Sequence, residues 1–504
     1  MTNNPIKLNN QEIFADFDNH ISLEGNDRIL FSAPFGTGKS TYLTEYFEHN
    51  FENYFCFNLY PVNYSVSQNE DIFELIKFDL LLQLMGKHRD EIDLENEDFS
   101  NVLSFQALFL KEFKLTPLLI SLIGESGKIG TSAKILIDEV QKQYKDFKET
   151  FENEEAFIEE YLRNIENKIG NINEMDAYSS MIFKLLERVK SKNESKEAVL
   201  IIDDLDRLDP EHIFRLFNIF SINFGKDKIL NKFGFDKIIF VCDIENIKNI
   251  YKHKYGSNVD FVGYIDKFYS YIPYEFDNLE IINKKLEELI ELNNNSESLF
   301  GTKDSREADR YQLFNSLKAI LISLLNNNLI NLRMLFNVRS LIVKSNVFYY
   351  SERSQHQTYE FPIITLFYIL KNYFGSFKEV QITISKMSNI TAQRKFSANH
   401  TVYNYNDEAF RSLLALCLPF LFELNGLGEI KNEQTEDGLV FHSASFDCYI
   451  HYKSNYNFRG SYDYYSIRNV TKHNDINADM ILLNPFEVLK YTFDECIKRG
   501  AITL

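Results

Sequence analysis

The feature that most constrains this chain is a glycine-rich loop between a short apolar run and a helical pattern. The loop reads A-P-F-G-T-G-K-S-T over residues 33–41. The run before it, Arg28 to Ser32, is typical of a buried strand, and a helical pattern begins at Thr41. Glycines allow backbone conformations and close approaches that a Cβ would obstruct. A strand, a tight loop and a helix in this order predict an α/β unit with a loop that can hold an anion at the helix N-terminus.

The loop matches the Walker A pattern, with Ala33 in place of the usual first glycine. Backbone N–H groups of such a loop surround phosphate oxygens. Lys39 is expected to reach the β and γ phosphates, and the Ser40 hydroxyl to bind Mg²⁺. Ala33 is compatible with this role if its φ is negative. The predicted nucleotide-binding residues are Phe35, Gly36, Thr37, Gly38, Lys39, Ser40 and Thr41.

A second motif follows the apolar run Ala198 to Ile202, which is typical of a central parallel strand. Asp203 and Asp204 stand directly after it, as in a Walker B pattern. Asp203 is expected to hold Mg²⁺, and Asp204 to polarise the attacking water, because phosphoryl transfer requires positioning and charge neutralisation. The alternative is a solvated acidic turn after a strand.

Alternating strand and helix patterns predict the fold class. Apolar runs at Tyr54 to Leu59 and Lys237 to Cys242 add two strands, so we expect a doubly wound α/β core with a parallel sheet. The predicted P-loop NTPase core covers 1–285, with a large helical insert at about 61–190. A helical lid subdomain follows at 286–350, and a C-terminal mixed α+β domain at 351–504. Ser351 to Gln357 is a candidate linker.

Charge and composition restrict the partners and the location. The net charge of −19 is concentrated in residues 1–350, because residues 351–504 sum to about −2. An acidic body repels a phosphate backbone, while the near-neutral C-terminal part leaves a nucleic-acid partner open. No apolar run approaches the ~20 residues of a membrane span, and the five cysteines form no CxxC pair. We therefore expect a cytoplasmic chain with no membrane span.

An aromatic and cationic stretch lies near the C-terminus. It could stack on single-stranded nucleic acid or form an ordinary aromatic β-surface. Its members are Tyr449, Tyr452, Lys453, Tyr456, Arg459, Tyr462, Tyr464, Tyr465 and Arg468.

The run D-D-L-D-R at Asp203 to Arg207 resembles the KAP family of P-loop NTPases. Asn58 to Tyr64 and Lys254 to Phe268 also resemble family segments, and the likeness covers roughly residues 20–340. The resemblance implies an AAA-like or STAND-like ATPase core with a helical insert between the Walker motifs. Many relatives carry transmembrane helices in that insert, and this chain does not. The resemblance also implies a place in bacterial conflict systems, including phage defence.

Three further residues are candidates, each with a structural alternative. Arg207 could act on the γ-phosphate of a neighbouring subunit as an arginine finger, or pair within its own chain with Asp203, Asp206 or Asp209. Asp243 occupies the place of a sensor residue or is a strand-end cap. Arg333 resembles the sensor arginine of the helical subdomain, and its alternative is a helix-surface arginine.

These observations lead to one main hypothesis. The chain is expected to bind and hydrolyse Mg-ATP to switch its conformation or assembly state, as a homo-oligomer with a protein partner from a neighbouring gene. A nucleotide-bound scaffold with little turnover and a nucleic-acid-stimulated motor are the alternatives.

Overall fold

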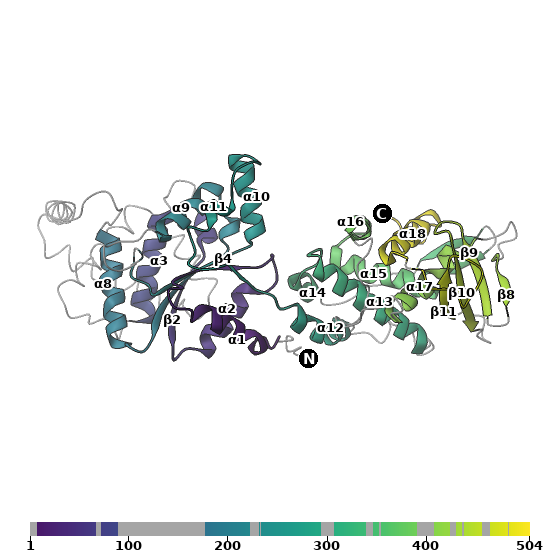
Figure 1. The fold of residues 1–504 in the computed structure, drawn as a ribbon, viewed down its shortest axis with the longest axis horizontal. Helices are drawn as coiled ribbons and strands as arrows, with labels where there is room; N and C mark the ends of the chain where they lie inside the picture. Colours follow the sequence, from purple (N-terminus) through teal and green to yellow (C-terminus); the bar gives the residue numbers. More distant parts are fainter. Residues whose placement is uncertain are drawn as a thin grey trace, which may run out of the picture. The chain divides into compact units, whose positions relative to one another are not determined.

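The computed structural model describes residues 8–66, 72–88, 177–221, 231, 233–293, 307–338, 346–351, 354–390, 408–423, 430–435, 438–455, 464–481 and 483–504 (Figure 1). These residues form two compact units. The first unit consists of Asn10–Phe35 and Lys39–Asp277. The second consists mainly of Asn278–Leu504, and the loop segment Gly36–Gly38 groups with it.

The first unit contains a five-stranded parallel sheet in the order β2-β3-β4-β1-β5. Its strands lie where the apolar runs predict them: β1 Arg28–Ser32, β2 Tyr54–Leu59, β3 Glu197–Ile202 and β4 Lys237–Cys242, with the short β5 Tyr274–Glu275 at the edge. The predicted α/β fold class with a parallel sheet is therefore confirmed.

Helices cover both faces of this sheet. Successive side chains of each strand point to opposite faces, so each strand contributes to both cores. Ile29 and Phe31 of β1 pack with helices α1 (Phe14–Ile21) and α2 (Lys39–His49). Leu30, between them, packs in the core on the other face. That face is covered by α3 (Ile72–Lys87), α8 (Ala177–Lys192), α9 (Pro210–Ser221), α10 (Ile244–Tyr255) and the short α11 (Val262–Ile265). Burial on both faces explains why the strands read as continuous apolar runs.

The strand order positions the chemistry. The carboxyl ends of parallel strands lie at one edge of a sheet, and ligands bind outside that edge. Strand β4 lies between β1 and β3. The glycine-rich loop after β1, Asp203 after β3 and Asp243 after β4 therefore meet at the same edge.

The second unit combines helices with an antiparallel sheet of order β11-β10-β9-β8. The strands are β8 Glu433–Thr435, β9 Gly438–Ser443, β10 Cys448–Asn455 and β11 Tyr464–Thr471. The helices are α12 Leu279–Asn293, α13 Glu307–Asn326, α14 Leu332–Asn337, α15 Pro362–Phe374, α16 Phe377–Ile390, α17 Glu408–Leu421 and α18 Pro485–Lys498. This mixed α+β architecture agrees with the expectation for the C-terminal part.

A single hydrophobic cluster runs through the second unit, from Ile282 to Ile502. The predicted lid subdomain 286–350 and the predicted C-terminal domain 351–504 both contribute to it. The structure thus groups these two predicted domains in one compact unit. Domain boundaries predicted from a sequence fall where the composition changes. A shared hydrophobic core depends instead on contacts between segments that are distant in the sequence.

One local prediction in the second unit is wrong. The candidate linker Ser351 to Gln357 contributes to a hairpin of β6 (Val347–Ser351) and β7 (Ser354–Gln357). The polar sequence of this segment gave no indication of strand pairing, in which Phe348 lies opposite His356.

The helical insert at 61–190 is described only in part. Residues Pro61–Val66 form a 3-10 turn, and α3 and α8 are helical as expected. The middle of the predicted insert, residues 89–176, lies outside the described residues. Among the helices that the structure describes, none combines the length and the apolar character needed to cross a membrane.

The described part of the C-terminal aromatic stretch contributes largely to the core. Tyr452 and Tyr465 are buried, and their rings pack against Phe422 at centroid distances of 5.6 and 5.5 Å. Tyr449 packs on His442 on the other face of the sheet. This packing agrees with the aromatic β-surface alternative, and a nucleic-acid partner remains a prediction.

Candidate functional site

The glycine-rich loop has the backbone that a phosphate-binding loop requires. Gly36 and Gly38 have φ values of 75° and 93°, which side chains rarely allow. Ala33 does not adopt a positive φ, so the condition for alanine at this place is met. Helix α2 begins at Lys39, and its N-terminal N–H groups face the loop. The loop and the helix dipole together favour an anion here.

Lys39 turns back into this loop. Its side chain is 8% exposed, and Nζ donates to the carbonyl oxygens of Ala33 (2.7 Å) and Pro34 (3.3 Å). Nζ also lies 5.4 Å from the centroid of the Phe35 ring. An ammonium has three N–H donors, and these two bonds use two of them. These two bonds hold the lysine charge within the loop.

The tip of the loop contacts the start of α14, within the second unit. The backbone N–H of Arg333 donates to the carbonyl oxygen of Gly36 (3.2 Å). A Cβ at Gly36 would lie 2.7 Å from Cγ of Asn331, so the close approach also requires glycine. The amide of Asn278 donates to the Thr37 carbonyl oxygen (2.8 Å). The side chain of Arg333 is exposed, as expected for a helix-surface arginine.

Ser40 and Asp203, the two predicted Mg²⁺ ligands, are in direct contact. Ser40 Oγ donates to Asp203 Oδ2 at 2.5 Å, although 163 positions separate them in the chain. The other carboxylate oxygen, Oδ1, accepts the backbone N–H of Asp204 (2.7 Å). Asp203 is 3% exposed, and this burial raises its pKa, although the bond from Ser40 and the charge of Lys39 oppose the rise.

Asp204 turns the chain away from the strand. It has a left-handed φ of 56°, a conformation that aspartate tolerates better than most residues. Its Oδ2 accepts a bond from Arg207 Nη1 at 2.7 Å, in an ion pair whose side chains are 28% and 45% exposed. Arg207 therefore pairs within its own chain, but with Asp204, which was not among the partners expected for it.

Asp206 and Asn246 belong to the same site, and the sequence analysis missed them as a pair. Asp206 is 6% exposed, and Asn246 Nδ2 donates to its Oδ2 at 3.2 Å. Burial raises the pKa of Asp206, while the bond from Asn246 and the charge of Lys39 lower it. Asp206 lies in the D-D-L-D-R run, so the motif itself indicates that this residue belongs to the site. No pattern in the sequence indicates that Asn246, on α10, reaches it.

Asp243, the candidate sensor, caps α10. Its Oδ1 accepts the backbone N–H groups of Glu245 (3.0 Å) and Asn246 (3.3 Å). This is the strand-end cap that the sequence analysis gave as the alternative. The cap also fixes the start of the helix that carries Asn246 to Asp206.

The carboxylate and hydroxyl oxygens suit a hard cation. Mg²⁺ prefers oxygen ligands and is usually held by one or two carboxylates together with substrate phosphates. Ser40 Oγ and Asp203 already meet, and Asp203 is buried with a raised pKa. A nearby cation would offset the cost of burying that charge. Ser40 and Asp203 are thus the residues that would hold Mg²⁺, which supplies charge neutralisation on the phosphates when it is bound.

Comparison with protein families bears directly on this geometry. The model of the KAP family P-loop domain matches residues 28–351, which is more than half of the chain. The chain belongs to the KAP family. The predicted resemblance is therefore confirmed, and the KAP domain contains both Walker motifs described above. A search of curated proteins found no match.

Membership of the KAP family supports a nucleotide-binding NTPase domain, and this family generally binds nucleotide together with Mg²⁺. The residues of the KAP domain that meet at the sheet edge are Lys39, Ser40, Asp203, Asp204 and Asp206.

Replacing Asp203 with asparagine should stabilise this KAP domain without nucleotide and remove its stabilisation by Mg-ATP. The folded-state pKa of Asp203 is raised, so its contribution to stability falls as pH rises through that pKa. Asparagine carries no charge to bury and can still bond to Ser40 and Asp204. The advantage of the variant should shrink as the pH approaches the ordinary pKa of aspartate.

Thermal unfolding at several pH values, with and without Mg-ATP, measures both effects. The exposed Asp209 is the matched control, because Asp209→Asn changes a carboxylate that caps the start of α9. An Asp203→Asn variant that keeps the full shift with Mg-ATP would contradict the assignment.

Proposed function

We propose that this KAP domain binds Mg-ATP and hydrolyses it, and that the nucleotide state switches the conformation or assembly of the chain. The single observation that carries the proposal is the contact of Ser40 with Asp203 beside the buried Lys39. A serine hydroxyl, a lysine ammonium and a strand-end carboxylate at one sheet edge are the groups that phosphoryl transfer uses.

In the proposed mechanism the loop N–H groups and Lys39 bind the β and γ phosphates. Ser40 and Asp203 would hold Mg²⁺. Asp204 orients the attacking water and accepts its proton, because its carboxylate follows the metal-binding residue and leaves the strand in a left-handed turn. Asp206 remains buried, and the hydrogen bond that it accepts from Asn246 links α10 to the site.

The Asp204–Arg207 ion pair favours a second candidate, a nucleotide-bound scaffold with little turnover. The Asp204 carboxylate accepts a bond from the Arg207 guanidinium at 2.7 Å, so the group that would accept the proton of the water is already engaged. Turnover then requires Arg207 to leave Asp204. Measuring the nucleotide retained by the purified protein, next to steady-state phosphate release, separates the two candidates.

Asp204→Asn should preserve Mg-ATP binding and lower phosphate release by about 10²–10⁴-fold, the usual contribution of a general base. Asparagine tolerates the left-handed backbone at this position, so the fold should persist. Lys39→Ala should abolish binding, and Asp209→Asn should turn over near the parent rate. Turnover of the Asp204→Asn variant at the parent rate would show that Asp204 is not the base.

We propose a homo-oligomer in which Arg207 leaves Asp204 and reaches the γ-phosphate of a neighbouring subunit. Its half-exposed side chain would allow this exchange. Arg207→Ala should then lose turnover by about 10³-fold while keeping ATP binding. Mixing it with the Lys39→Ala variant should restore activity, because one subunit supplies the nucleotide and the other the arginine. Inactive mixtures, with a monomer mass in Mg-ATP, would exclude the exchange.

We also propose that the switch acts in bacterial anti-phage defence with a protein partner from a neighbouring gene. Two observations support this proposal. The chain belongs to the KAP family, and its Walker motifs are followed by a second unit, most of which lies beyond the residues that match the family model. Bacteria that express the chain with its neighbouring genes should resist infection, and Lys39→Ala should remove the resistance. Equal plating of phages on both strains, across a broad phage panel, would refute the defence role.

A further inference from the structure

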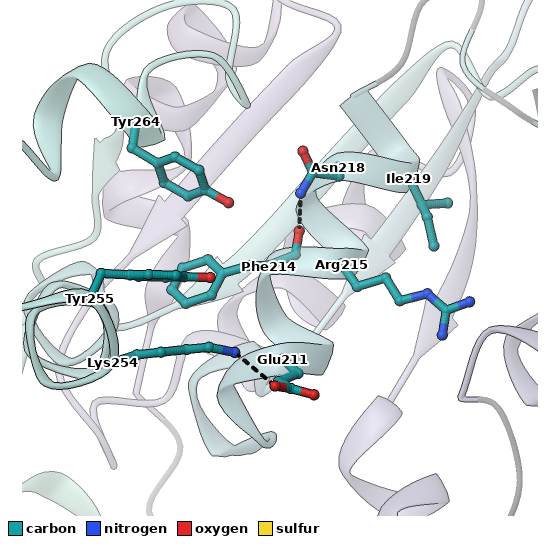
Figure 2. A pocket seen from close by; sticks show the side chains of 8 residues that line it. All are labelled: Glu211, Phe214, Arg215, Asn218, Ile219, Lys254, Tyr255 and Tyr264. Carbon is teal, nitrogen blue, oxygen red and sulfur yellow. Dashed lines mark hydrogen bonds and ion pairs between the residues drawn. The ribbon is translucent and has the colours of Figure 1, made fainter.

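A second candidate binding site lies on α9, α10 and α11, in the first unit. It is a pocket of about 410 Å³ lined by Glu211, Phe214, Arg215, Asn218, Ile219, Lys254, Tyr255 and Tyr264 (Figure 2). None of these residues belongs to the Walker motifs. The volume lies within the range of about 300–1,000 Å³ that ligand-binding sites occupy.

The floor of the pocket is aromatic and closely packed. Phe214 is 4% exposed, and Tyr264 packs edge-on against it with centroids 5.6 Å apart. Tyr264 also stacks on Tyr251 at 4.8 Å. Tyr255, by contrast, is 48% exposed and lies 5.8 Å from Phe214. A firm floor beside an exposed ring can receive one apolar side chain, and tyrosines supply such contacts at a low cost in conformational entropy.

The rim of the pocket is charged and open. Lys254 Nζ pairs with Glu211 Oε1 at 3.3 Å, and the side chain of Glu211 is 80% exposed (Figure 2). Arg215 adds a second, exposed cation. A rim this exposed suits a segment that lies across the surface, rather than a small molecule enclosed on all sides.

The side chains that line the pocket differ in charge from the chain as a whole. They include two cations, Arg215 and Lys254, and one carboxylate, Glu211, which gives +1, whereas the whole chain carries −19. Cations at the rim of a pocket on an acidic protein attract negative segments and give them a preferred place to bind.

We propose that this pocket docks an acidic segment of a partner protein, which inserts one aromatic or aliphatic side chain beside Tyr255 while its carboxylates meet Arg215 and Lys254. Docking does not depend on the proposed ATPase function. A coupling between docking and nucleotide does rest on it: α9 starts directly after the Walker B turn, and α10 carries Asn246 to Asp206.

The test uses a short fluorescent peptide with phenylalanine at its centre and glutamates on both sides, bound to the full chain and followed by fluorescence anisotropy. Arg215→Glu and Tyr255→Ala should each weaken binding by about tenfold or more. The matched control is Lys285→Glu, because it reverses the charge of a cation on α12 that does not line the pocket. Circular dichroism shows whether each variant is folded.

Three further results decide the proposal. The Lys39→Ala variant should bind the peptide as the parent does, so that a failure of the ATPase proposal leaves docking testable. Peptides with lysine in place of glutamate, or alanine in place of phenylalanine, should bind about tenfold more weakly. No binding of the acidic peptide, or equal binding by all variants, overturns the proposal. A labelled single-stranded oligonucleotide or self-association that is lost in Arg215→Glu would assign the surface to nucleic acid or to a second copy.

Discussion

The hydrogen bond from Ser40 to Asp203 is the contact on which the site depends. It joins the first turn of α2 to the end of β3 across 163 positions of sequence. In this sheet β4 lies between β1 and β3, and all three strands run parallel, so the carboxyl ends of β1 and β3 lie at the same edge. The parallel sheet thus brings the two side chains together despite their separation in the sequence. Burying the ionised carboxylate of Asp203 costs free energy, and a cation bound beside it would offset this cost.

The charges around this contact balance one another. The ammonium of Lys39 donates to a loop carbonyl oxygen. Burial raises the pKa values of Asp203 and Asp206, and the charge of Lys39 lowers both. Arg207 compensates Asp204 at the more exposed end of the same strand. Buried charges persist only when they are paired or hydrogen-bonded. A site built in this way is prepared for a polyanion with its cation, at some expense of stability, as functional sites commonly are.

The sequence predicted the elements of the core better than the relations between them. β2 and β4 lie at the predicted residues, because buried parallel strands leave continuous apolar runs and the glycine-rich loop needs a strand before it and a helix after it. Asn246 could not be predicted, since its approach to Asp206 depends on the packing of α10 beside the end of β3. The hairpin of β6 and β7 was missed for a similar reason: its polar residues are held by pairing, which composition does not record.

The most direct test of the account is a double-mutant cycle on Mg-ATP affinity, measured by titration calorimetry with Ser40→Ala, Asp203→Asn and the combined variant. If the two side chains hold one metal, their effects should be coupled by about 1–3 kcal/mol in Mg-ATP. The coupling should vanish when EDTA removes the metal. Additive effects in Mg-ATP, or single variants that bind as tightly as the parent, would contradict the account.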